Sequence, residues 1–192
     1  MKIKTGIYLL IAACFFYSAA NAQKKKQNDL FKNFHSFNSV QLHNGSSTSS
    51  VSLHSVNGFG RKIFAGIGVG FDYYYHRTAP LFLEGRYDLF GKERKLQLVA
   101  GAGIHVPVEN INRREPFKKG DFKPGKLLSA GFDYLIPIKK DALIMGVAYS
   151  RKEVIQMVDN NVWDPVHNMI TNIPIKEKYL FNRISVKIGW VF

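Results

Sequence analysis

The chain has 192 residues, enough for one domain, and its 27 basic against 14 acidic residues give a net charge of +13 at pH 7. A single cysteine, Cys14, excludes an internal disulfide framework. After residue 22 no run of residues reaches the roughly 18 apolar positions that a membrane-spanning helix needs, so a helical membrane protein is excluded as well.

The first 22 residues have the order of a secretory signal peptide. Lys2 and Lys4 precede an apolar run over 7–17, and an A-x-A cleavage site ends at Ala22. Cleavage there removes two of the 27 basic residues and no acidic residue, which leaves 170 residues with a net charge of +11. The alternative is lipidation, because the four residues ending at Cys14 resemble a lipobox, although the apolar run continues beyond them. For an exported chain, this charge favours lipid phosphates or acidic glycans over nucleic acid as partners.

Residues 23–36 are polar and basic without a clear period, and we expect a flexible periplasmic tail there. Eight segments with the alternation of β-strands follow in 37–192, the first two of them weakly patterned. They cover 37–43, 49–56, 63–75, 80–90, 95–108, 126–138, 142–154 and 179–192. An even number of strands, most of them long enough to cross a bilayer at a tilt, predicts an all-β, eight-stranded, antiparallel, up-and-down transmembrane β-barrel.

The connections between these segments differ in length in a regular way. The second, fourth and sixth connections are short, whereas the fifth and seventh (109–125 and 155–178) are long. Outer-membrane barrels keep short turns on the periplasmic side and long loops outside. The rhythm therefore predicts an outer-membrane barrel with both termini in the periplasm.

The two faces of the strands predict which side meets lipid. Apolar side chains, with large aromatic residues near the strand ends, occupy one face, as in a lipid-facing wall with interfacial girdles. The opposite face carries charges that must pair inside a narrow lumen. We expect a lumenal ion-pair network of Asp72, Glu84, Arg86, Asp88, Asp133, Arg183 and Lys187, in which Arg183 and Lys187 pair with acids of the third and fourth strands.

Glycine recurs on this inward face, at Gly66, Gly68, Gly70, Gly101, Gly103 and Gly131. We expect these glycines to leave room for long arginine and lysine side chains reaching across the lumen, or simply to allow strand bending. The lumen is then a packed, non-conducting plug. The alternative is a narrow polar path for water or ions.

Four stretches of the chain resemble a known family: GFGRKIFAGIGVGFDYYY, PLFLEGRYDLF, LQLVAGAGI and ISVKIGWVF. They are similar to the small outer-membrane β-barrel proteins of the OmpA transmembrane-domain and OmpX-like group, and to the porin-family outer membrane β-barrel domain. The resemblance implies an outer-membrane location. It also implies that the ending, with Trp190 and Phe192, is the signal read by the barrel-assembly machinery. It implies no particular activity.

The long connections hold the remaining candidate sites. Basic residues of the fifth are expected to contact outer-membrane lipids, specifically lipopolysaccharide phosphates, unless the loop is merely solvated. These residues are Arg113, Arg114, Lys118, Lys119, Lys123 and Lys126. The seventh connection, with Trp163, Asp164, His167 and Met169, suits binding of an extracellular protein or ligand.

No catalytic residues, metal site or cofactor are expected. His76 and Ser150 lie on strands that are not neighbours, and the six histidines are scattered singly. The sequence thus favours an integral outer-membrane protein with a plugged lumen and a structural or surface-interaction role. The alternatives are a narrow pore, a lipid-modifying barrel enzyme, or a soluble periplasmic lipocalin-like barrel.

Overall fold

The computed structural model describes residues 33–46, 48–90, 95–108, 120–164 and 169–192, and they form β-strands joined by turns. No helix in this part of the chain is long and apolar enough to cross a membrane. The strands are β1 (Phe34–Gly45), β2 (Ser49–Gly60), β3 (Ile63–Asp72), β4 (Thr78–Phe90), β5 (Lys95–Pro107), β6 (Gly120–Lys123), β7 (Gly125–Ile138), β8 (Asp141–Asp164) and β9 (Met169–Val191).

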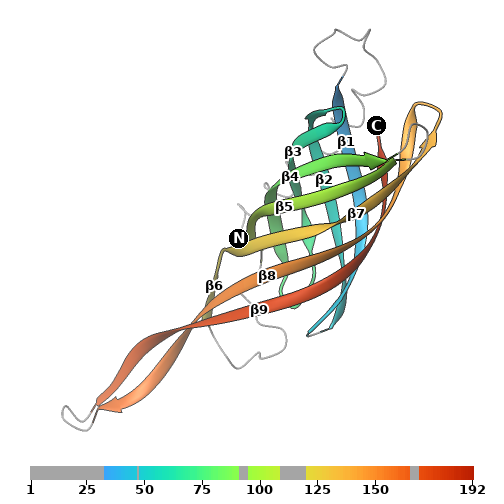
Figure 1. The fold of residues 1–192 in the computed structure, drawn as a ribbon. Coiled ribbons are helices and arrows are strands. Elements are labelled where there is room, and N and C mark those ends of the chain that lie inside the picture. Colours follow the sequence, from blue (N-terminus) through green and yellow to red (C-terminus); the bar gives the residue numbers. More distant parts are fainter. Residues whose placement is uncertain (1–32, 47, 91–94, 109–119, 165–168) are drawn as a thin grey trace, which may run out of the picture.

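Eight of these strands close into an antiparallel barrel in sequential order (Figure 1). Each pairs with the next along the chain, and β1 pairs with β9 from Phe37–Val191 to Gly45–Arg183. Closure removes both free edges of the sheet over this length. The predicted eight-stranded, up-and-down barrel is therefore confirmed, and β6 is a short additional strand outside the count.

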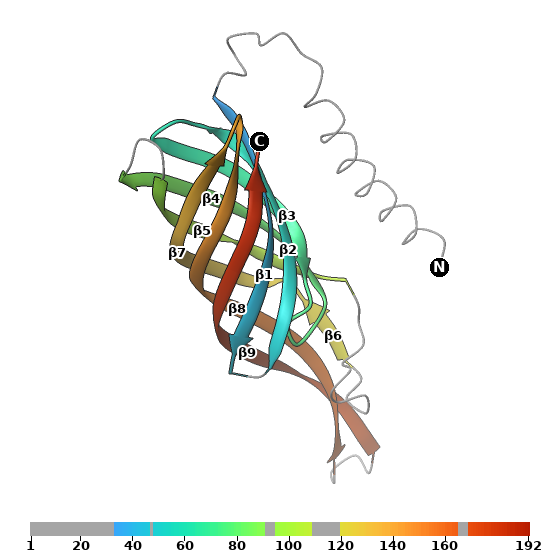
Figure 2. The same cartoon turned by 90° about the vertical axis from the view of Figure 1, so that its right-hand side faces the viewer.

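Both chain ends of the barrel lie at one end of it, which we call the terminal end (Figure 2). There the backbone N–H groups of Ser36 and Phe192 each donate to the other residue's carbonyl, at 3.2 and 3.1 Å. β1 begins at Phe34, so its first three residues fall in the segment expected as a tail. The opposite end, from which β8 and β9 project, is called the hairpin end.

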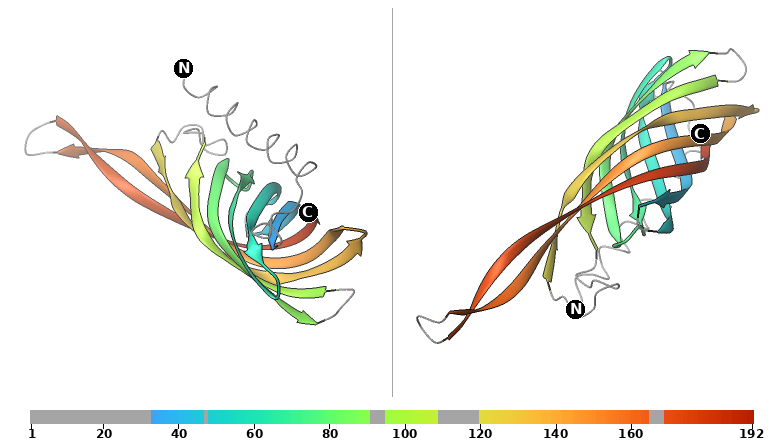
Figure 3. Two further views of the ribbon diagram at one scale, coloured as in Figure 1. Left: turned by 90° about the horizontal axis from the view of Figure 1, so that it is seen from above. Right: turned by 60° about the horizontal axis from the view of Figure 1, so that its bottom comes forward.

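The seventh connection was predicted as a loop over 155–178, and this is wrong. β8 and β9 continue to pair far beyond the barrel, from Ile155–Lys178 to Asp164–Met169, and form a twisted two-stranded ribbon (Figure 3). A strand ladder needs only one neighbouring strand, so it continues where the barrel stops. Pro174 is tolerated because β9 is an edge strand in this part.

The fifth connection also contains structure. Its end forms β6, which pairs with β8 from Gly120–Val158 to Lys123–Ile155 and covers one edge of the ribbon near the barrel. Phe122 of β6 is buried there. The expected loop thus returns to the barrel, because an apolar side chain within it gains by burial against β8.

The two faces of the strands lie as the alternation predicts. Ile67, Leu83 and Ile184 are 59%, 66% and 66% exposed on the outer wall, while Arg86 on the inner face is 4% exposed. The interior is less uniformly polar than expected, because two apolar clusters share it with the charges. The first cluster contains Phe37, Val56, Phe64, Phe82, Leu127, Leu135, Ile144 and Val191, and the second contains Tyr74, Phe122, Val154 and Phe181.

The inward glycines make room mainly for aromatic rings and backbone, which corrects the expected role in accommodating arginine and lysine. A Cβ on Gly68 would lie 2.3 Å from the Phe82 ring, and one on Gly66 would lie 2.7 Å from the Phe64 ring. Such distances are far below van der Waals contact. Gly66 and Gly68 of β3 are therefore needed because the ends of two phenylalanine rings lie against them.

Candidate functional site

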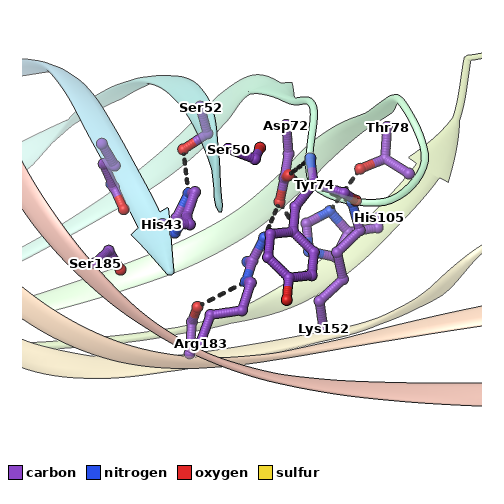
Figure 4. A network of polar contacts seen from close by, with 12 residues as sticks. His43, Ser50, Ser52, Asp72, Tyr74, Thr78, His105, Lys152, Arg183 and Ser185 are labelled. Carbon is purple, nitrogen blue, oxygen red and sulfur yellow. Dashed lines mark hydrogen bonds and ion pairs between the residues drawn. The ribbon is translucent and has the colours of Figure 1, made fainter. Parts of the chain in front are cut away.

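The inner face of the barrel carries its charges in two clusters, and the first surrounds Asp72 at the hairpin end (Figure 4). The buried Asp72 carboxylate accepts from Nη1 of Arg183 at 2.5 Å and lies 3.3 Å from Nζ of Lys152. The backbone N–H of Tyr74 donates to the same carboxylate at 2.8 Å. Asp72 is thus neutralised by two cations that come from β8 and β9, on the far side of the closing seam.

The two cations of the Asp72 cluster have further partners. Lys152 Nζ donates to the carbonyls of Tyr74 and His76, at 2.8 and 3.0 Å. Arg183 Nε donates to Ser150 Oγ at 3.1 Å. Buried charges are tolerated only when such hydrogen bonds replace water. The turn after β3 is therefore held to β8 by backbone carbonyls as well as by charge.

His105 completes the Asp72 cluster from β5. Its Nδ1 lies 3.1 Å from Thr78 Oγ1, and its Nε2 lies 3.9 Å from Asp72 Oδ2. The guanidinium of Arg183 also lies over the Tyr74 ring, 5.2 Å from its centre, as in a cation–π contact. The cluster therefore joins β3, β4, β5, β8 and β9 across the lumen.

The second cluster surrounds Asp133, nearer the terminal end. Its Oδ2 accepts from Arg86 Nη1 at 2.9 Å and from Lys187 Nζ at 3.0 Å. Arg86 is also 2.7 Å from Glu84, and its guanidinium lies 3.8 Å from the centre of the Phe37 ring. Arg86 therefore joins the charged cluster to the first apolar cluster.

The predicted network residues are thus placed together in part. Asp72 was expected beside the acids of the fourth strand, but Asp72 pairs with Thr78, six residues before Glu84 on β4. Lys187 was expected to pair with acids of the third or fourth strand; its partner Asp133 lies on β7 instead. The predicted pairing of Arg183 with an acid of the third strand is present, with Asp72, whereas the pairing predicted for Lys187 is wrong. Strand order alone does not tell which strands face each other across a barrel.

Asp88 lies towards the terminal end and is joined to the Asp133 cluster through Gln97, whose Oε1 accepts from Arg86 Nη1 at 3.3 Å. Asp88 accepts from Gln97 Nε2 at 2.6 Å and pairs with the half-exposed Lys95 at 3.1 Å. Gln97, His105 and Lys152 were not among the predicted site residues. Lys152 and His105 lie on the polar face of their strands in the sequence, which is the signal that could have found them.

Between the two clusters the interior is packed. Arg183 and Lys187 are four residues apart on β9, about 13 Å along a strand. The space between them holds a cavity of about 20 Å³, which fits about one water molecule. Gln41 bonds His54 at 2.8 Å and His43 bonds Ser52 at 2.7 Å beside it. A wider recess of about 220 Å³ opens at the terminal end, beside Phe37 and Phe64.

The predicted loop and terminal residues have different positions. Arg113, Arg114, Lys118, Lys119 and His167 lie outside the described residues. Lys123 is exposed in β6, Lys126 is exposed near the start of β7, and Trp163, Asp164 and Met169 belong to the tip of the β8–β9 ribbon. Trp190 is half-buried and Phe192 is exposed at the terminal end.

The residues considered for catalysis or metal binding make packing contacts. Ser150 accepts from Arg183, and the His76 ring stacks on Phe122 with 3.9 Å between ring centres. Within the described part of the chain, no three histidine, cysteine or acidic side chains are grouped as a metal site requires. The arrangement is suited to holding strands together across a lumen.

Comparison with known proteins agrees with this fold. No family model and no curated protein sequence matches the chain. The crystal structure of Neisserial surface protein A (NspA) is similar with a TM-score of 0.50 and 11% sequence identity, over 81% of this chain and 95% of that one. The expected resemblance to small outer-membrane barrels is thus confirmed at the level of the fold. The chain has the eight-stranded antiparallel barrel fold of Neisserial surface protein A.

Proposed function

We propose that this protein is an integral outer-membrane β-barrel protein with a closed lumen and a structural or surface-interaction role. One observation carries the proposal: exposed apolar side chains such as Leu83 cover the outer wall, while fixed charges such as Arg86 and Asp133 are buried inside. A barrel in water would place these classes of side chain the other way round. In a bilayer the same arrangement is favourable.

The packed interior supports a plug over the alternative of a pore. Arg86 lies on Phe37, ion pairs cross the lumen in both clusters, and the cavity between the clusters fits about one water molecule. A hydrated ion needs a continuous wider path. We therefore infer that the lumen stabilises the barrel and does not conduct.

The test combines membrane fractionation with heat-modifiable migration on a detergent gel and with planar-bilayer recording. We expect the protein in the outer-membrane fraction, faster migration of the unheated form, and no conductance steps. Recovery in the soluble periplasmic fraction would refute the membrane assignment. Regular conductance steps would instead support the pore, and altered lipid A in a deletion strain would support the enzyme.

The proposed orientation puts the termini in the periplasm and the β8–β9 ribbon outside the cell. β1 stops pairing with β9 at Gly45–Arg183, so β9 has an unpaired edge along the ribbon, where Ile175 and Leu180 are exposed. An exposed strand edge can accept an added strand of a partner protein. This edge supports the proposed surface-interaction role of 155–178. The proposal includes two further interactions. The barrel-assembly machinery recognises Trp190 and Phe192. Lipopolysaccharide phosphates contact the basic residues Arg113, Arg114, Lys118, Lys119 and Lys123.

A further inference from the structure

Two cations stand without a carboxylate partner on the outer wall of the barrel. Lys126 of β7 and Arg151 of β8 are both exposed, and neither has an ion pair with any residue that the structure describes. Each lies on the outward face of its strand, in phase with the exposed Leu128 and Tyr149. They therefore face the same surroundings as the apolar wall.

The register brings these two cations close to each other. Leu128 pairs directly with Arg151, and Lys126 is the next residue on the same face of β7. A diagonal pair of this kind on neighbouring antiparallel strands has backbones about 7–8 Å apart. The long side chains of lysine and arginine can close on one small anion across that distance.

The height of the pair on the wall indicates what that anion is. Leu128 and Tyr149, which are 55% and 52% exposed, are the last exposed large apolar side chains on the described parts of β7 and of β8 towards the hairpin end. The Tyr149 hydroxyl donates to Asn182 Oδ1 at 2.9 Å, and Asn182 pairs with Arg151. Tyrosine in this position is typical of the boundary between hydrocarbon and headgroups. Lys126 and Arg151 thus lie at headgroup level at the hairpin end.

We propose that Lys126 and Arg151 together bind one phosphomonoester of lipopolysaccharide in the outer leaflet. This inference rests on the proposed outer-membrane location and orientation. A phosphomonoester carries about −1.5 to −2 charges at pH 7 and matches two cations, whereas the phosphodiester of an ordinary phospholipid carries one. Arginine adds a planar pair of donors suited to phosphate oxygens.

A neighbouring lysine provides the matched control. Lys178 of β9 is also exposed at the hairpin end, but its Nζ is 2.9 Å from the Glu153 carboxylate. Its charge is already compensated within the protein. Replacing Lys178 removes one positive charge from the same region without removing an uncompensated cation, whereas a single replacement of Lys126 or Arg151 removes one.

The experiment titrates the full-length protein, folded in detergent, with lipid A and measures bound lipid by native mass spectrometry. Wild type is expected to retain lipid A, and Lys126→Gln with Arg151→Gln is expected to bind at least about tenfold more weakly. Lys178→Gln is expected to bind like wild type, and Arg151→Lys to keep part of the affinity. Equal affinity of the double variant and wild type would overturn the proposal.

Two further lipids separate the possible anions. Phosphatidic acid, a monoester, is expected to compete with lipid A, and phosphatidylglycerol, a diester, is not. Equal competition by phosphatidylglycerol would show a general anionic surface and reject the phosphomonoester site. Heat-modifiable migration of each variant separates a loss of binding from a failure of the barrel itself. A wild-type protein that is folded and membrane-inserted but does not bind lipid A would overturn only this inference.

Discussion

Asp72 is the residue on which most of the interior contacts at the hairpin end depend. Its carboxylate balances Arg183 and Lys152, and it also accepts the backbone N–H of Tyr74. All of these groups are buried. A change at Asp72 therefore affects three partners at once, which makes it the sharpest single test of the interior.

Asp72→Asn is expected to destabilise the folded barrel by about 3–5 kcal/mol, because two buried cations lose their counter-charge. Urea unfolding, followed by the heat-modifiable band shift, measures the change. Asp88→Asn is the matched control, since Asp88 pairs with the half-exposed Lys95, and an exposed pair contributes only about 0–1 kcal/mol. Equal effects of the two substitutions would contradict the role given to the Asp72 cluster.

Gly68 tests the packing of aromatic rings against β3. Gly68→Ala would place a methyl group 2.3 Å from the Phe82 ring, so the ring must move, and we expect a loss of about 1–3 kcal/mol. Gly85→Ala is the control, because Gly85 faces outward and its nearest neighbouring atom would be 4.0 Å from the new group. Unfolding midpoints compare the two variants. If Phe82→Leu fails to rescue Gly68→Ala, the clash with the ring is not the cause.

At the scale of elements, the β8–β9 ribbon is the part that the sequence did not predict, because its lack of alternation indicated a loop. Residues 155–178 lack the apolar and polar alternation of a lipid-facing strand, because this segment has no hydrocarbon on one side and no lumen on the other. Apart from the short pairing of β6 with 155–158, its two strands pair with each other only, in the part of the chain that the structure describes. Period-two alternation arises when one face of a strand is buried. A strand that is paired but has no buried face therefore does not show this alternation in its sequence.

Replacing 157–176 by a short turn is expected to leave the barrel folded, because the closing pairs between β1 and β9 end at Arg183. Heat-modifiable migration should therefore persist. The proposed role is measured by attachment of whole cells to surfaces coated with host or bacterial proteins. Cells with the full-length chain are compared with cells that carry the shortened chain. Unchanged attachment of the shortened chain would argue against surface interaction through the ribbon.

Phe192, the residue that follows β9, provides a test of assembly. Phe192 is exposed and bonds the backbone of Ser36, while the side-by-side pairing of β1 and β9 begins at Phe37–Val191. Deletion of Phe192 is thus expected to allow refolding in detergent but to lower the amount assembled in the outer membrane. Immunoblots of membrane fractions measure the latter. Normal assembly without Phe192 would show that it is not the insertion signal.

At the scale of the whole molecule, the barrel's two surfaces explain why so much could be predicted. In the proposed membrane location, strands with one apolar and one charged face are accommodated by closing into a barrel, with lipid outside and paired charges within. Because the number of antiparallel barrel strands is even, the two ends of the barrel chain lie at the same end of the barrel. The fold is shared with Neisserial surface protein A at 11% sequence identity, so it does not depend on a large set of identical residues.

The sequence by itself determined the eight segments that form the barrel and which face of each is apolar, because these depend on local alternation. It did not determine β6 or the ribbon. Only the tertiary structure decided that Asp72 meets Lys152, that Lys187 meets Asp133, and that glycines of β3 lie under phenylalanine rings. Contacts across a lumen depend on strand tilt and register around the whole circumference. No single strand carries that information, and so these partners appear only once the barrel is closed.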